Sequence, residues 1–129
     1  YEEKLAGSIK SAGSFTVYHN CGKARILQES YVKMGLDAWE TVSDTPQGDN
    51  DLEAAKKNIG SRITLIGNLD QIEFLKTASV RDIENKTEEI ISIGKPGGRF
   101  IFACSDYIEK NTPFENIEAA VRAARRAGK

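Results

Sequence analysis

ITLIGNLD, at residues 63–70, decides the fold, because it predicts a buried strand with a helix on either side. Residues 63–66 are an apolar, β-prone run, and residues 67–70 are typical of the turn that follows a strand. The preceding segment, residues 50–60, has helical spacing and begins with Asn50 and Glu53 as a capping pair. The following segment begins with Ser79 and Asp82 as a second capping pair.

The same alternation extends to both ends of the chain. Further β-prone runs lie at residues 15–18, 37–42 and 100–103, and a last helix is predicted after Thr112 as N-cap with Pro113 at its first position. Strands alternating with helices predict the α/β class with a parallel sheet, and the apolar strands fit burial on both faces. Two architectures remain open at this point: an open doubly wound sheet, or part of a (β/α)8 barrel.

The bulk properties narrow the class of protein. A length of 129 residues and a formal net charge of -1 predict one domain, residues 1–129, with no electrostatic case for nucleic acid. No apolar run approaches the roughly 18 residues that span a membrane, so no membrane partner is expected. Two cysteines make no disulfide framework, which favours the cytoplasm. Because the sequence opens at Tyr1 within a helical pattern, we expect a fragment of a longer protein.

The only histidine and the only two cysteines follow predicted strands. Alternate residues of a strand point to the same side, so His19 and Cys21 can present an imidazole and a thiolate together. Cys104 ends the fourth predicted strand and Glu40 ends the second. The carboxyl ends of parallel strands share one face, where ligands bind. His19, Cys21 and Cys104 therefore predict a zinc site, with Glu40 as a candidate fourth ligand.

Each of these residues also has a structural explanation. A cysteine at the end of a buried strand is usually a small apolar side chain, and Glu40 could simply cap a loop. Asn68 and Asp70 fit a turn at least as well as they fit a contact with substrate. The combination of His-x-Cys with a second strand-end cysteine favours the metal.

Five segments together resemble the uroporphyrinogen decarboxylase superfamily. They are HNCG at 19–22, GLDAWE at 35–40, LIGNLD at 65–70, GGRFI at 97–101 and TPFENI at 112–117. The resemblance covers nearly the whole chain. It implies the C-terminal half of a TIM (β/α)8 barrel, with four parallel strands that alternate with helices.

The superfamily contains two chemistries. True uroporphyrinogen decarboxylases need no metal and have a histidine near the last strand, where this chain has Cys104 and Ser105. The other branch resembles methylcobamide:coenzyme M methyltransferases, which hold zinc by a His-x-Cys motif and a distant cysteine. His19, Cys21 and Cys104 of this chain match that pattern.

The resemblance therefore favours a zinc-dependent enzyme that moves a methyl group from a corrinoid to a thiol, with a corrinoid protein as a possible partner. Glu40, Asn68 and Asp70 are then candidate catalytic residues, although the spacing of Glu40 fits imperfectly. The alternatives are a uroporphyrinogen III decarboxylase of porphyrin biosynthesis, or an inactive fragment that self-associates through its open sheet edges.

Overall fold

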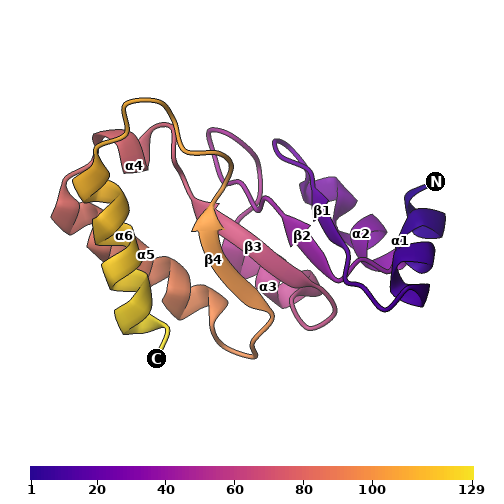
Figure 1. Cartoon of the computed structure of the whole chain (residues 1–129). Helices are drawn as coiled ribbons and strands as arrows, with labels where there is room; N and C mark the ends of the chain where they lie inside the picture. The colour runs from indigo at the N-terminus through magenta and orange to yellow at the C-terminus, as the bar shows by residue number, and fades with distance from the viewer.

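The computed structural model describes all residues, 1–129, and contains four parallel strands in the order β1-β2-β3-β4 (Figure 1). The strands are β1 (Val17–His19), β2 (Ala38–Glu40), β3 (Thr64–Leu69) and β4 (Phe100–Cys104). The helices are α1 (Glu2–Ser11), the 3-10 turn η1 (Arg25–Leu27), α2 (Gln28–Lys33), α3 (Leu52–Ile59), α4 (Phe74–Thr77), α5 (Val80–Gly94) and α6 (Phe114–Ala127). The predicted α/β alternation is confirmed.

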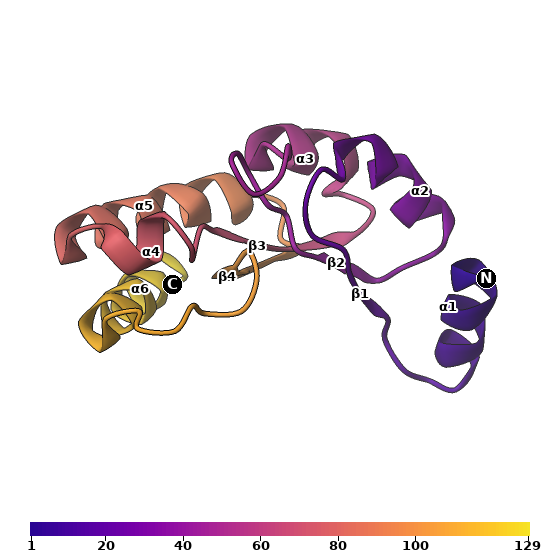
Figure 2. The same ribbon diagram turned by 90° about the horizontal axis from the view of Figure 1, so that it is seen from above.

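The strand order decides between the two architectures that the sequence left open. Strands that follow one another in the chain are neighbours throughout, so the sheet has no point at which its winding reverses. A doubly wound sheet needs that reversal to place helices on both faces, whereas right-handed crossovers in one direction place them all on one face. Figure 2 shows the helices as an arc along one side of the sheet, ending in α1 and α6. This is the arrangement of part of a (β/α)8 barrel.

The two sides of the sheet have different residues. Tyr18, Trp39 and Leu65 pack with the helices in the hydrophobic core. Their neighbours along the strands point to the other side, which no helix covers and which we call the open side. Val17 and Ile101 on the open side are 60% and 52% exposed. Burial on both faces, which the apolar strands suggested, is therefore not found in this chain.

Two of the three predicted helix starts differ from the structure. Ser79 caps α5 as expected, accepting a hydrogen bond from the Asp82 N–H. Asp51, and not Asn50, caps α3, because the Asn50 side chain is fully buried and donates to the carbonyl oxygens of Gly22 and Ser43. Pro113 occupies the N-cap position of α6 that we expected for Thr112.

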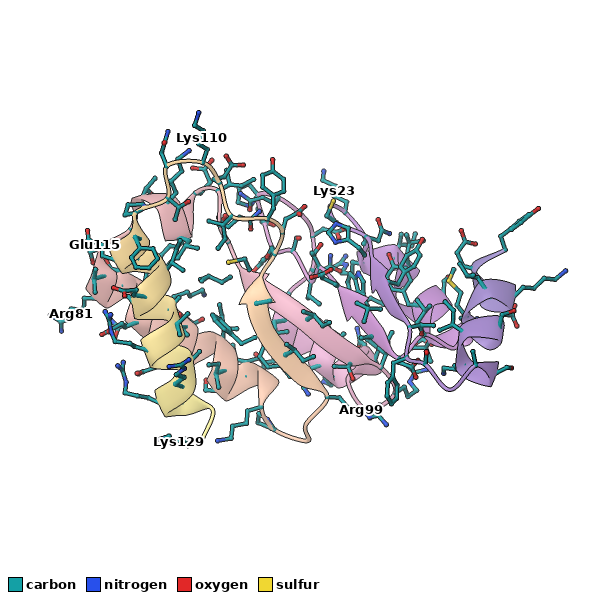
Figure 3. All side chains as sticks on the ribbon, in the orientation of Figure 1. Lys23, Arg81, Arg99, Lys110, Glu115 and Lys129 are labelled. Carbon is teal, nitrogen blue, oxygen red and sulfur yellow. The ribbon has the colours of Figure 1, made fainter.

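Charge is spread over the periphery of the molecule. Figure 3 shows the labelled side chains, among them Lys23, Arg99 and Lys110, at its outer edges. Arg126 near the C-terminal end of α6 pairs with Glu84 and Glu88 of α5, so that acidic side chains of α5 balance its charge. None of the helices is both long and apolar enough to cross a lipid bilayer.

The sheet edges carry the first prediction, which is association of this 129-residue chain in solution. Neither β1 nor β4 has a partner strand on its outer side. Phe15 just before β1 and Val17 at its start are 85% and 60% exposed. Unpaired edges with apolar neighbours favour pairing with another chain. We expect light scattering to give the mass of a dimer or larger species. The double variant Val17→Lys with Ile101→Lys is expected to shift the mass toward the monomer, and a monomeric wild type with a cooperative melt would contradict the prediction.

Candidate metal site

The carboxyl ends of the strands bring together His19, Cys21 and Asp106. His19 is the last residue of β1, Cys21 follows it, and Asp106 lies in the loop between β4 and α6. One ligand atom from each residue lies within 4.8 Å of the others. An imidazole nitrogen, a thiolate sulfur and a carboxylate oxygen are the donor types that zinc binds in proteins, so this donor set fits the metal predicted from the sequence.

The His19 ring is held between two carboxylates. Its Nδ1 lies 3.2 Å from Oε2 of Glu40, the residue beside it on β2, and its Nε2 lies 3.9 Å from Oδ2 of Asp106. When Nδ1 donates its proton to Glu40, the Nε2 lone pair is free to bind a metal. Glu40 is not one of the three clustered ligands, and its contact in this structure is with His19.

The segment around Asn20 fixes the position of His19 and Cys21. The Asn20 N–H donates to the Glu40 carbonyl oxygen at 2.7 Å, and its own carbonyl oxygen accepts from Trp39 Nε1 at 3.2 Å. The Asn20 amide also donates to the Tyr31 hydroxyl. Because Trp39 and Tyr31 are buried in the core, the chain between the two candidate ligands is tied to the rigid part of the fold.

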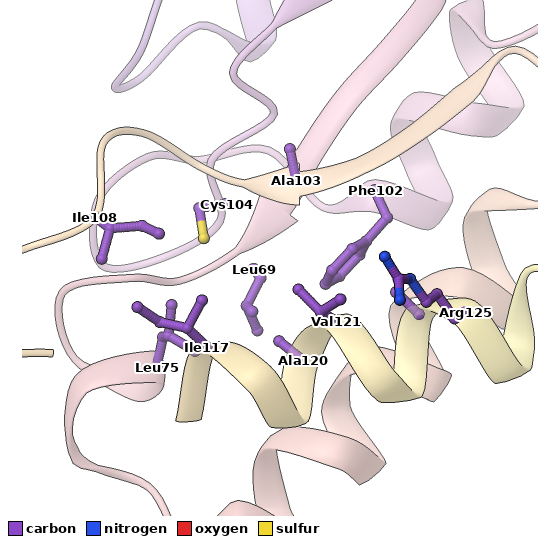
Figure 4. A pocket seen from close by; sticks show the side chains of 11 residues that line it. Leu69, Leu75, Phe102, Ala103, Cys104, Ile108, Ile117, Ala120, Val121 and Arg125 are labelled. Carbon is purple, nitrogen blue, oxygen red and sulfur yellow. The ribbon is translucent and has the colours of Figure 1, made fainter. Parts of the chain in front are cut away.

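Cys104 ends β4 as predicted, but it lies on the other side of the sheet from His19. Phe100, Phe102 and Cys104 alternate along β4 and pack toward the helices. In Figure 4 the Cys104 sulfur points to the α6 side, and Ala103 points the opposite way. The structure therefore does not bring Cys104 to His19 and Cys21. A position at the end of a strand places a residue at the carboxyl edge of the sheet, but it does not decide which face of the sheet the side chain points to.

The Cys104 thiol lines an apolar cavity of about 430 Å³ between β4 and α6 (Figure 4). Leu69, Ile117 and Val121 are among the other residues that line it. Burial raises the pKa of the Cys104 thiol above its usual value, and the nearby Asp70 carboxylate raises it further. This environment favours the neutral thiol, whereas a zinc ligand must be a thiolate.

Asn68 and Asp70, the other two candidate catalytic residues, lie in different surroundings. Asn68 is half-buried on β3 and alternates with the core residues Leu65 and Leu69, which places it on the open side with Glu40. Asp70 follows β3, and its Oδ1 accepts hydrogen bonds from the N–H groups of Ile72 and Glu73 at 2.8 and 3.0 Å. This oxygen of Asp70 therefore stabilises the turn before α4.

Comparison with known proteins identifies the family. Residues 1–127 match the family model described as uroporphyrinogen decarboxylase. The chain belongs to the uroporphyrinogen decarboxylase family. Among solved structures it is similar to a methyltransferase from Methanosarcina mazei, with a TM-score of 0.81 and 24% identity, over 99% of this chain and 35% of that one. The chain thus spans about a third of the length of that methyltransferase, and no curated protein matches it.

Asp106 is the one residue of the cluster in this uroporphyrinogen decarboxylase family member that the sequence did not predict. Its only signal is its position just beyond a strand end, where the other candidates also lie. The Ser105 N–H donates to the Leu69 carbonyl oxygen at 2.8 Å, which fixes the start of the loop against β3. Asp106 Oδ1 accepts the Tyr107 N–H, so that Oδ2 is left facing His19.

The Glu40–His19 contact gives a second prediction. Loss of a carboxylate that orients a metal-binding histidine typically costs about 10–100-fold in metal affinity. We expect Glu40→Ala to weaken zinc binding by about that factor in a calorimetric titration. Glu29→Ala is the matched control, because Glu29 is an exposed acid that pairs with Arg62, away from the site. Equal zinc affinity of Glu40→Ala and wild type would contradict the orienting role.

Proposed function

We propose that the protein containing this chain is a zinc-dependent methyltransferase that moves a methyl group from a corrinoid to a thiol. The observation that carries the proposal is the clustering of His19 and Cys21 with a third metal-binding side chain at the carboxyl ends of the strands. Ligands bind at that face in parallel α/β folds. Membership of the uroporphyrinogen decarboxylase family and the likeness to a methyltransferase support the class of enzyme.

The roles of the residues follow from their positions. His19 and Cys21 would hold the zinc, whereas Cys104, the third ligand predicted from the sequence, lies on the other side of the sheet from them. When bound, zinc supplies Lewis acidity that lowers the pKa of a substrate thiol and favours its thiolate. Glu40 orients the His19 ring, and Asn68 on the same open side is a candidate for hydrogen bonding to the substrate.

Asp70 is a weaker candidate for contact with substrate, because one carboxylate oxygen already accepts two backbone hydrogen bonds. A corrinoid, free or on a partner protein, is the methyl donor in this proposal. The thiolate sulfur attacks the methyl carbon, and the S–C bond forms as the Co–C bond breaks. The electron pair of that bond stays on cobalt, which changes from Co(III) to Co(I), and the thiol proton passes to solvent.

The test uses the full-length protein purified with its metal. We expect about one zinc per chain and transfer of the methyl group from methylcobalamin to 2-mercaptoethanesulfonate, followed by the absorbance of the corrinoid and the mass of the thioether. His19→Ala is expected to lose both the zinc and the transfer. Decarboxylation of uroporphyrinogen III without any metal requirement, together with no methyl transfer, would contradict the proposal and favour the decarboxylase alternative.

A further inference from the structure

We infer that Asp106, and not Cys104, is the third protein ligand of the metal held by His19 and Cys21. The site then has a single protein thiolate, and Cys104 is a packing residue of the β4–α6 cavity. The inference rests on the proposed function in one respect only, namely that a metal binds at His19 and Cys21.

The first support is the distance between the ligand atoms. Donor atoms around a tetrahedral zinc lie roughly 3.5 Å apart, given bonds of about 2.0–2.3 Å. The three atoms from His19, Cys21 and Asp106 already lie within 4.8 Å of one another without a metal. His19 and Cys21 are exposed and Asp106 is half-buried, so small side-chain rotations bring the donors to bonding distance.

The second observation that supports Asp106 as the ligand is that its two carboxylate oxygens make different contacts. Oδ1 accepts the Tyr107 N–H at 2.8 Å, which holds the carboxylate in place. Oδ2 lies 3.9 Å from Nε2 of His19, the nitrogen that the Glu40 contact leaves free for a metal. The carboxylate is therefore oriented toward the position that a metal would occupy between it and the ring.

The third support is the cost of bringing Cys104 to the same position. Moving its sulfur to the open side requires a one-residue slip of β4, which exchanges the two faces of the strand. That slip would break the pairing of Leu69 with Cys104 and expose Phe102, which now lies against the core. The Ser105 N–H bond to Leu69 lies just beyond the strand and opposes the slip.

The ligand set has a consequence for the metal. One thiolate, one carboxylate and a neutral imidazole together balance the charge of a divalent cation, as two thiolates and an imidazole would. The carboxylate is a harder ligand than a thiolate, and a mixed nitrogen, oxygen and sulfur set suits both zinc and cobalt(II). Cobalt(II) therefore serves as a spectroscopic probe of this site.

The experiment is a titration of the full-length metal-free protein with Co²⁺, read by the thiolate-to-cobalt charge-transfer band in the near ultraviolet. We expect Cys21→Ala to abolish the band and Cys104→Ala to change neither its intensity nor the dissociation constant. Asp106→Ala is expected to weaken binding by at least about a hundredfold, since even loss of a supporting residue costs about 10–100-fold. Asp106→Cys is expected to restore binding with a band of about twice the intensity, because a second thiolate then binds.

The experiment distinguishes failure of the Asp106 inference from failure of the proposed function. A band that falls to half in both Cys104→Ala and Cys104→Ser, while Asp106→Ala binds Co²⁺ like wild type, overturns the inference and leaves the proposed function intact. The expected pattern of bands in a protein that transfers no methyl group overturns the proposed function alone. A wild type that binds neither Co²⁺ nor Zn²⁺ overturns both. Far-ultraviolet circular dichroism of each variant shows whether it is folded.

Discussion

Replacing Cys21 with alanine is expected to weaken zinc binding by at least about a hundredfold. Loss of a residue that merely supports a ligand costs about 10–100-fold, and the loss of a ligand removes a metal bond as well. Cys21 is exposed and makes no contact with the hydrophobic core, so the fold should survive the change. The measurement is competition with a chelator, followed by the zinc retained per chain.

Cys104→Ala is the matched control for Cys21→Ala, because it removes the same functional group from the only other cysteine. Cys104 is partly buried against α6, so its removal is expected to lower stability slightly and to leave the zinc affinity unchanged. A Cys21→Ala variant that keeps the zinc affinity of wild type would remove Cys21 from the site and with it the proposed metal centre.

Replacing Trp39 with alanine is expected to lower the free energy of unfolding by about 3–5 kcal/mol, as for other buried aromatic residues. The Trp39 side chain is fully buried, and the centroids of its ring and the Tyr31 ring lie 4.9 Å apart. Its Nε1–H also holds the Asn20 carbonyl oxygen between His19 and Cys21. Urea unfolding followed by circular dichroism measures the loss of stability, and the zinc affinity is expected to fall with it.

Trp39→Phe separates packing from the hydrogen bond. Phenylalanine fills much of the same space and loses the donor to Asn20, so we expect a smaller loss of stability, of about 1–2 kcal/mol. A Trp39→Ala variant that unfolds within about 1 kcal/mol of wild type would show that the core does not depend on this ring.

The fold class follows from the sequence because the strands and helices have clear local patterns. The sequence predicts β3 near residues 63–66, and the Ser79 cap of α5 is where the sequence predicts it. The predicted turn at residues 67–70 is wrong in part, because β3 continues through Gly67 and Asn68 to Leu69, where it pairs with β4. Local patterns do not decide between an open sheet and part of a barrel, since both alternate strands with helices. The strand order decides it, and that order depends on contacts between distant segments.

The site was less predictable, for reasons that particular residues show. His19 pairs with Glu40 on the neighbouring strand, so the two side chains lie on the same open side of the sheet. Cys21 is two residues after His19, and alternate residues along an extended chain point to the same side. The sequence does not show which face of the sheet Cys104 points to, because Phe100 to Cys104 are all apolar and polar residues do not alternate with apolar ones. A lone aspartate after a strand has no signature, and Asp106 reaches His19 although β1 and β4 lie at opposite edges of the sheet.

The role of Glu40 could be predicted only in part. Its position at the end of β2 places a carboxylate beside the candidate metal ligands, as the sequence indicates. Whether that carboxylate binds a metal or orients a ligand depends on side-chain geometry, which the sequence does not contain. In the structure its Oε2 lies 3.2 Å from the Nδ1 atom of His19.

We propose that His19 and Cys21 form the core of a zinc site. The most direct test of this proposal is anomalous scattering at the zinc edge, measured on crystals of the full-length protein grown with zinc. We predict a strong anomalous peak at bonding distance from His19 Nε2 and Cys21 Sγ. Well-ordered density for both side chains with no anomalous peak between them would contradict the claim.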